Sequence, residues 1–206
     1  YMRDFIARGD LGRLFYVNST RVNLGIFQKD INVIWDLAPH DISMLIYGLQ
    51  ERPTQVSARG AAYVQPHIED VAWVTLGFPS GAMADVRVSW LDPCKIRRTT
   101  VVGSKKMLVY DDVEPTEKIR IYDKGVDAPP YSDTLEEFHL SYRYGDITTP
   151  AISGWASAVA NANVPPMLWP TTTSRSTRSA KVRHAASTSP AQSCHVVVSM
   201  SSTVVP

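Results

Sequence analysis

The sequence predicts an α+β fold in which one principal helix packs on an open, largely antiparallel sheet. Residues 33–49 have helical spacing, because polar side chains recur on one side and apolar side chains on the other. From residue 54 onward the chain changes to short segments rich in β-branched and aromatic residues, with tight turns such as Pro79-Ser80-Gly81 between them. Tight turns between successive strands favour antiparallel pairing. With so few helices to cover the sheet, we expect a partner domain or subunit on its far face.

The expected elements follow one another along the chain. Residues 1–8 are typical of the end of a helix, closed by the turn Gly9-Asp10-Leu11-Gly12. A strand at residues 14–23 and a loop at residues 24–32 lead into the principal helix. Pro39 lacks a backbone N–H, so this helix should begin close to Asp36. Further strands are expected at residues 54–64, 70–78, 82–91, 97–104, 106–112 and 118–123, and residues 142–146 close the ordered part.

The helix carries a candidate acid–base pair. Asp36, His40, Ser43 and Tyr47 share one side of it, opposite the apolar side. Asp36 suits the first turn, where the helix dipole stabilises a carboxylate, and the same dipole disfavours a charged imidazole at His40. A neutral His with a carboxylate four residues away is built like a general base. The alternative interpretation is a capped helix start with a surface histidine.

Two polar residues of the first strand are candidates for substrate binding. Alternation places Arg21 and Asn23 on one face of the strand at residues 14–23. Since the following loop leads straight into the helix, these side chains and the Asp36–His40 pair can meet at one end of the sheet. A guanidinium beside an amide suits a carboxylate, a phosphate or sugar hydroxyls. Equally, Arg21 can simply pair with a neighbouring acid.

Other patterns carry less information. Residues 90–97 (WLDPCKIR) crowd cations beside an aromatic ring, which suits an anion contact or a solvated strand end where Pro93 breaks the ladder. Asp111-Asp112 follows a strand, but two carboxylates without further oxygen ligands are weak support for a cation site. The sequence has no GxGxxG motif, no Walker lysine loop, no GxSxG motif and no zinc-ligand spacing. We therefore expect no metal site, and cofactor-binding residues cannot be assigned.

Composition excludes several classes of protein. A net charge of +1 argues against general attraction to nucleic acid or membranes, and no apolar run approaches the length of a membrane span. Cys94 and Cys194 form no metal or redox spacing, which favours a reducing cytoplasm. The first residue is not Met, and the chain opens inside an amphipathic helix, so we expect a further segment upstream.

The last third of the chain differs sharply from the rest. No Asp or Glu follows Asp146, and the only charges there are four scattered cations at Arg175, Arg178, Lys181 and Arg183. Ser, Thr, Ala and Pro dominate without a sustained period, so this stretch buries too little apolar surface to offset the entropy of ordering. We expect residues 156–206 to be a disordered tail or the product of a frameshift. An arm for nucleic acid is a poor interpretation of so few cations.

Taken together, the order of motifs resembles the C-terminal domain of the Gfo/Idh/MocA family of NAD(P)-dependent oxidoreductases. The motifs that carry the resemblance are GDLG, STRVNLG, WDLAPHDI, SWLDPCKIR, VVGSKKMLVYDD and YRYGDI, within roughly the first 150 residues. The likeness is greatest to the nucleotide-sugar 3-dehydrogenase type, and it shifts the interpretation of His40 towards catalysis. After Trp155 the sequence departs from the family, which continues with a long helix bearing acidic and apolar residues.

The resemblance implies roles for the motifs that match. Asp36 and His40 are then catalytic, Arg21 and Asn23 contact the substrate, and the sheet forms an oligomer interface. Family members bind NAD or NADP on an N-terminal Rossmann domain that also carries a catalytic Lys. Neither feature is found in this sequence. Residues 1–12 then end the helix that joins the two domains, residues 13–155 form the substrate and oligomerisation domain, and residues 156–206 are the atypical tail.

Two functions are consistent with these expectations. The first is the C-terminal part of a sugar or UDP-sugar oxidoreductase, in which His40 takes or returns the hydroxyl proton; this chain alone should bind no dinucleotide and be inactive. The second is a non-enzymatic oligomerisation or binding module with a vestigial site. Both predict a homo-oligomer formed through the sheet, with no nucleic-acid or membrane partner.

Overall fold

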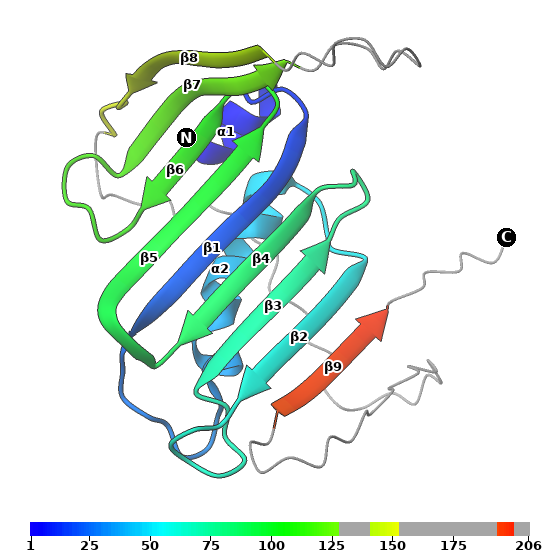
Figure 1. The fold of residues 1–206 in the computed structure, drawn as a ribbon, viewed down its shortest axis with the longest axis vertical. Coiled ribbons are helices and arrows are strands. Elements are labelled where there is room, and N and C mark those ends of the chain that lie inside the picture. The colour runs from blue at the N-terminus through cyan, green and yellow to red at the C-terminus, as the bar shows by residue number, and fades with distance from the viewer. Residues whose placement is uncertain (128–140, 153–192, 200–206) are drawn as a thin grey trace, which may run out of the picture.

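The computed structural model describes residues 1–127, 141–152 and 193–199, and over these ranges the fold is the expected α+β arrangement. A nine-stranded sheet has the strand order β8-β7-β6-β5-β1-β4-β3-β2-β9 (Figure 1). All neighbouring strands pair antiparallel except β1 and β4, which are parallel. The helices are α1 (Met2–Ala7) and α2 (Val33–Leu49). The strands are β1 (Leu14–Leu24), β2 (Gln55–Ala61), β3 (Val71–Gly77), β4 (Met83–Ser89), β5 (Leu91–Gly103), β6 (Met107–Asp111), β7 (Ile119–Asp127), β8 (Ser141–Thr148) and β9 (Ser193–Ser199).

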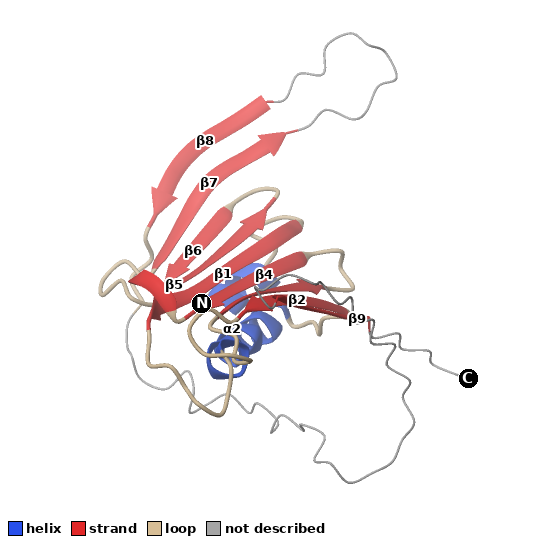
Figure 2. Cartoon of the chain, turned by 60° about the horizontal axis from the view of Figure 1, so that its bottom comes forward, coloured by secondary structure: helices blue, strands red, loops and turns tan. Residues whose placement is uncertain are grey.

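Both helices cover the same face of the sheet. Figure 2 shows α1 and α2 on one side, while β7 and β8 curve away from the other strands. The core between α2 and the sheet is built by alternating strand residues, such as Val17 on β1, Val74 on β3 and Val86 on β4, each at most 3% exposed. Ala38 and Leu45 supply the buried side of α2, as its periodicity predicts. In the described ranges, neither helix is long and apolar enough to cross a membrane.

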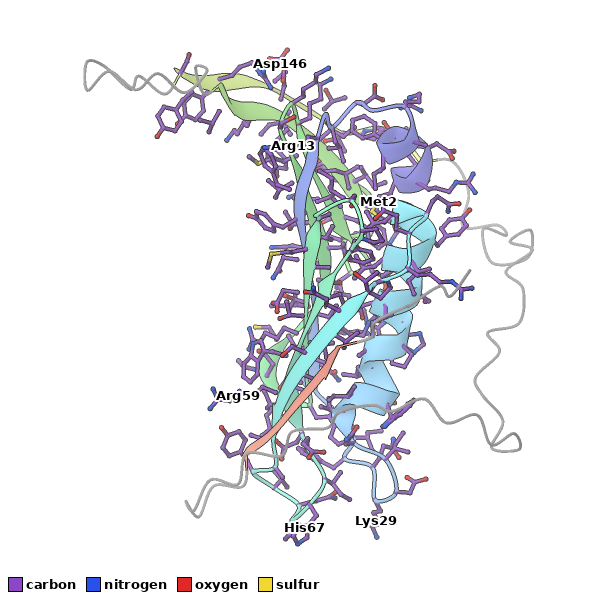
Figure 3. The ribbon with its side chains drawn as sticks, turned by 90° about the vertical axis from the view of Figure 1, so that its right-hand side faces the viewer. Met2, Arg13, Lys29, Arg59, His67 and Asp146 are labelled. Carbon is purple, nitrogen blue, oxygen red and sulfur yellow. The ribbon has the colours of Figure 1, made fainter. Side chains whose placement is uncertain are left out.

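The opposite face of the sheet has no helix over it in the described part of the chain. Figure 3 shows the sheet edge-on, with α2 on one side and the labelled Arg59 side chain projecting from the other. Large apolar side chains on this face remain exposed: Tyr16 is 49%, Trp73 42% and Met83 57% exposed. A shallow hollow lies among them, lined by Tyr16, Val17, Asn18, Thr75, Met83, Ala84 and Asp85. This is the uncovered face on which we expected a partner.

The start of α2 corrects one prediction. Asn32, not a residue near Asp36, is the N-cap, and its side chain accepts a hydrogen bond from the Trp35 N–H at 3.2 Å. Asp36 lies in the first turn, as expected, but Pro39 lies inside the helix. Proline has no N–H, so Pro39 cannot donate a hydrogen bond to the carbonyl of Trp35. This lost hydrogen bond is the reason why we expected Pro39 in the first turn of the helix. Packing of Val33 and Ala38, both 0% exposed, favours the longer helix.

The ends of the strands also differ from expectation. β5 begins at Leu91 and includes Pro93, because a register shift between Val22 and Leu24 of β1 leaves the residues around Pro93 outside the ladder. Residues 142–146, expected to close the ordered part, lie within β8, which pairs with β7. Of the atypical tail, only residues 193–199 are described, and they form β9 along the outer edge of β2. The rest of residues 156–206 lies outside the described residues.

Candidate functional site

Asp36 is held by a tryptophan from the sheet. The indole Nε1–H of Trp90 donates to Asp36 Oδ2 at 2.9 Å, and Trp90 is only 1% exposed. Trp90 lies between β4 and β5, so the bond fixes the first turn of α2 against the middle of the sheet. One oxygen of the Asp36 carboxylate thereby accepts a hydrogen bond from a neutral donor, which orients the side chain.

His40 lies one turn further along α2. Residues at i and i+4 share one side of a helix, so His40 follows Asp36 on the same side. The side chain of His40 is exposed, and its backbone carbonyl accepts a hydrogen bond from Ser43 Oγ at 2.8 Å. Within the described ranges, no group of three or more His, Cys, Asp or Glu side chains is placed to hold a metal ion. The imidazole of His40 therefore lies exposed on the surface of α2.

Asn23 lies in the same neighbourhood, through the loop that follows β1. The Gly25 N–H donates to the Trp90 carbonyl at 3.0 Å. A Cβ built on Gly25 would lie 3.0 Å from Trp90 Cδ1 and 3.3 Å from Asn23 Nδ2, so a larger residue would require one of these side chains to shift. Phe27 completes the arrangement, with its ring edge-on to Trp90 at 5.6 Å. Trp90 thus brings Asn23 and Asp36 to the same end of the sheet, where the sequence predicted that they would meet.

Arg21 has the partner that the alternative interpretation foresaw. Its Nε donates to Asp41 Oδ2 at 2.5 Å, and the two side chains are 12% and 2% exposed. The other oxygen of Asp41 accepts from Ser19 Oγ at 2.7 Å, and Ser19 Oγ lies 3.0 Å from Thr99 Oγ1. Ser19, Asp41 and Thr99 are all buried. The pair therefore ties α2 to β1 directly beside His40, and Arg21 keeps Nη1 and Nη2 for other contacts.

A second polar cluster continues from Arg21 across the sheet. Arg21 on β1 is directly opposite Arg97 on β5. Next to them, Tyr110 Oη donates to Asp112 Oδ1 at 2.9 Å, and Arg97 Nη1 lies 3.5 Å from Asp112 Oδ2. Lys118 Nζ donates to the Asp112 carbonyl at 2.9 Å. We call Arg21, Arg97, Tyr110, Asp112 and Lys118 the β1–β6 polar cluster.

The protonation states in this cluster follow from burial and hydrogen bonding. Burial of the ring, together with the hydrogen bond to Asp112, raises the pKa of Tyr110 to about 12. Burial also acts to raise the pKa of Asp112, but hydrogen bonds from Tyr110 and Arg97 outweigh it and leave that pKa below its usual value. Near neutral pH the cluster therefore holds a protonated phenol and an ionised carboxylate.

The neighbouring Asp111 does not join Asp112 in a cation site. Asp111 Oδ2 accepts from Arg98 Nη2 at 2.7 Å, and successive residues of a strand point to opposite faces. Sequence patterns did not indicate Asp41 and Trp90 as the partners of Arg21 and Asp36. A signal for Asp41 was present, because it is an acid on the apolar side of the helix, and a buried carboxylate requires a partner.

Comparisons with known proteins agree with this architecture. A family model described as the GFO/IDH/MocA C-terminal domain matches residues 1–109. No curated protein sequence matches the chain. Among solved structures, UDP-N-acetylglucosamine 3-dehydrogenase GnnA from Acidithiobacillus ferrooxidans is similar with 21% identity and a TM-score of 0.50, over 71% of this chain and 45% of that one.

Two further solved structures are similar. An inositol dehydrogenase homologue from Azotobacter vinelandii, complexed with NADH and myo-inositol, has 17% identity and a TM-score of 0.53, over 69% of this chain and 38% of its own. An oxidoreductase domain protein from Kribbella flavida has 17% identity and a TM-score of 0.51, over 69% and 42%. The chain spans less than half of these proteins, and at such identities the likeness shows the fold. Since the family model covers more than half of the sequence, this chain belongs to the GFO/IDH/MocA family through its C-terminal domain.

Proposed function

We propose that residues 13–155 are the substrate and oligomerisation domain of an NAD(P)-dependent sugar or nucleotide-sugar oxidoreductase. The observation that carries this proposal is the pairing of an oriented carboxylate with an exposed imidazole on α2. Trp90 holds Asp36 at 2.9 Å, and His40 follows one turn later on the same side. An oxidation of a sugar hydroxyl needs a group that accepts the hydroxyl proton as the carbonyl forms.

His40 is the proposed proton acceptor. When the C–O bond of the substrate becomes a carbonyl, the O–H proton passes to the imidazole, and in the reverse direction His40 returns it. Asp36, one turn away, stabilises the resulting imidazolium by its negative charge. Asn23 and the remaining nitrogens of Arg21 orient the sugar, which places the reacting hydroxyl within hydrogen-bond reach of His40. The name of the similar Acidithiobacillus enzyme supports a nucleotide sugar as the substrate.

The residues that the structure describes do not fit the phosphates of a dinucleotide. Such phosphates bind at the N-terminus of a helix that follows a glycine-rich turn. In the described ranges, the long helix α2 follows no such turn, and its N-cap is Asn32. We therefore assign dinucleotide binding to a Rossmann domain that this sequence does not contain, and a dinucleotide bound there supplies the hydride chemistry.

A second function is supported by the uncovered face of the sheet. Tyr16 and Met83 are directly opposite each other on β1 and β4, and Trp73 is exposed on the same face of β3, which suits a contact with a second copy of this chain. An oligomerisation module with a vestigial site needs this face but not His40. The two widely spaced cysteines support a cytoplasmic location for either function.

One substitution separates the two functions. In a chimera that joins a family Rossmann domain to this chain, His40→Ala should lower the rate of NADH formation with UDP-sugar about a hundred- to ten-thousandfold. Ala is a good helix former, so the thermal stability of the variant should stay close to that of the parent. Unchanged turnover of the variant across neutral pH would refute a catalytic role for His40. No turnover in the parent chimera would instead favour the oligomerisation module.

A further inference from the structure

Glu69 connects the loop between β2 and β3 to the first residues of α2. The Val33 N–H donates to the Glu69 carbonyl at 2.9 Å, and Asn32 Nδ2 donates to Glu69 Oε2 at 2.8 Å. Figure 3 shows the two segments at the same end of the molecule, marked by the labelled Lys29 and His67. Glu69 therefore binds the start of the helix through both its backbone and its side chain.

The carboxylate of Glu69 determines which way the amide of Asn32 points. A carboxylate can only accept hydrogen bonds, so the NH2 end of the amide faces it. The oxygen end is then left to accept the Trp35 N–H, which is the bond that caps the helix. With the amide reversed, two oxygens would face each other at Glu69 and two N–H donors would face each other at Trp35.

The next residue of the loop holds the other partner of the first helical turn. The Asp70 carbonyl accepts the Trp90 N–H at 2.9 Å, and the Trp90 indole donates to Asp36. Asp70 is 1% exposed, and its Oδ2 accepts the N–H groups of Tyr63 and Val64, both at 2.8 Å. Two successive residues of one loop thus hold the N-cap of α2 and the tryptophan that orients Asp36.

The sheet leaves room for the side chain of Glu69. A Cβ built on Gly60 of β2 would lie 2.8 Å from Glu69 Cγ and 3.2 Å from Glu69 Cβ. Any larger residue at position 60 would therefore force Glu69 to move. The stem of Glu69 packs directly on β2, which limits how far its carboxylate can swing away from Asn32.

We propose that Glu69 is a positioning residue for the Asp36–His40 pair. It acts through the N-cap Asn32 on the first turn of α2, which contains Asp36 and precedes His40. A displacement of about 1 Å in a reacting group can cost about a hundredfold in rate. The proposal deepens the proposed function, and as a statement about rate it rests on that function.

Kinetics of the chimera measure the effect on rate. Glu69→Ala should lower kcat about ten- to a hundredfold. The KM for the UDP-sugar should change less than about threefold, because Arg21 and Asn23 lie on β1 and not on the loop. Glu69→Gln keeps an oxygen that accepts from Asn32 Nδ2, so it should retain most of the rate.

The matched control removes a carboxylate near the other end of α2. Glu51 comes directly after the C-cap Gln50, and its Oε2 accepts the Ser80 N–H at 3.2 Å. Glu51→Ala should leave kcat unchanged, because this contact is far along the helix from Asp36. Thermal melts show whether each variant is folded at the temperature of the assay.

Reversing the hydrogen bond tests the contact itself. Asn32→Asp keeps a good N-cap residue but places a second carboxylate opposite Glu69, so it should lower kcat about as much as Glu69→Ala. Adding Glu69→Gln should restore the rate, because the amide introduced at position 69 can donate to the carboxylate at position 32. This rescue remains informative if Glu69→Ala does not fold.

The 206-residue chain gives a readout that does not depend on turnover. In NMR spectra, the Trp90 Nε1–H should exchange with solvent about tenfold faster in Glu69→Ala than in the parent, and Glu51→Ala should leave the rate unchanged. Equal kcat losses in Glu69→Ala and Glu51→Ala, an unchanged kcat in both, or failure of the rescue would overturn the proposal. A parent chimera without turnover, combined with faster exchange in Glu69→Ala, would overturn the proposed function but keep Glu69 as the residue that orders the first turn.

Discussion

Arg21 of β1 and Asp41 of α2 form a buried ion pair in which Nε and Oδ2 are 2.5 Å apart. Asp41 comes directly after His40 in the helix, so the pair anchors the candidate base to the central part of the sheet. Ser19 donates to the same carboxylate and lies within hydrogen-bond distance of Thr99. The pair therefore affects both the stability of the domain and the geometry of the site.

Removing the acid of this pair should be strongly destabilising. Asp41→Ala leaves the guanidinium of Arg21 without its counterion, and breaking a buried pair in this way costs about 3–5 kcal/mol. The measurement is the free energy of unfolding from urea denaturation of the chain. Asp111→Ala is the control, because its partner Arg98 is 53% exposed and such pairs contribute about 1 kcal/mol or less. Similar losses in both variants would contradict the prediction.

The bond between Trp90 and Asp36 can be measured by a double-mutant cycle. Trp90→Phe keeps an aromatic ring beside Phe27 but removes the indole donor, and Asp36→Ala removes the acceptor. The coupling free energy from urea denaturation should be about 1 kcal/mol, the usual net value of a hydrogen bond of this kind. A coupling near zero would show that the bond does not hold the first turn of α2.

Tyr110 makes the domain sensitive to strong base. Its pKa is raised from 10.0 to about 12, so an unfolded chain loses the phenolic proton before the folded one does. The stabilisation is complete below about pH 10 and is lost as the pH rises from 10 to 12. Its upper limit is about 2–3 kcal/mol, reduced by solvent screening because the ring is only half buried.

The check compares the parent with Tyr110→Phe. The difference in free energy of unfolding between the two should shrink between pH 10 and 12, since only the parent loses this contribution. Other tyrosines and lysines titrate in both proteins and cancel in the comparison. A difference that stays constant over this range contradicts the assigned shift.

The chain should not bind a dinucleotide by itself. No glycine-rich turn precedes α2, the long helix of the described residues, and without such a turn the phosphates find no set of backbone N–H groups. Calorimetric titration of NADH into the chain should give no saturable heat, whereas the chimera with a Rossmann domain serves as the positive control. Micromolar binding to the chain would refute this prediction.

β9 should protect the outer edge of β2. It pairs with β2 along seven positions, from Gln55↔Ser199 to Ala61↔Ser193. Truncation after Gln192 leaves the N–H and C=O groups of that edge without strand partners, which favours edge-to-edge association. Analytical ultracentrifugation should show a concentration-dependent increase in mass for the truncated chain relative to one ending at Ser199. Identical behaviour of the two chains would mean that β9 does not cover the edge in solution.

Local patterns in the sequence predicted most of the elements. The helical spacing of residues 33–49 and the alternation in strands β2 to β4 could be recognised, because each pattern involves residues that are close together in the sequence. Strand ends were less predictable. Pro39 lies inside α2 and Pro93 inside β5, because packing and a register shift made both positions acceptable.

The partners within the site could not be predicted in the same way. Asp36 and Trp90 are 54 residues apart, and Arg21 and Asp41 meet only because α2 crosses β1 at that point. A single sequence holds no record of such contacts. The sequence indicated which side chains are candidates for catalysis or substrate binding, namely Asp36, His40, Arg21 and Asn23. What each of them contacts depends on the tertiary fold.

The parallel pairing of β1 with β4 has a consequence for how the protein is made. β1 precedes both of its neighbours, β4 and β5, which come from residues 83–103, after α2, β2 and β3. A ribosome therefore releases this strand long before its partners exist. The resulting loop must be closed in one late step, which is entropically costly and typically slow. Until then the apolar residues of β1 depend on chaperones or on α2 for cover, and synthesis that pauses before residue 103 leaves them exposed to aggregation.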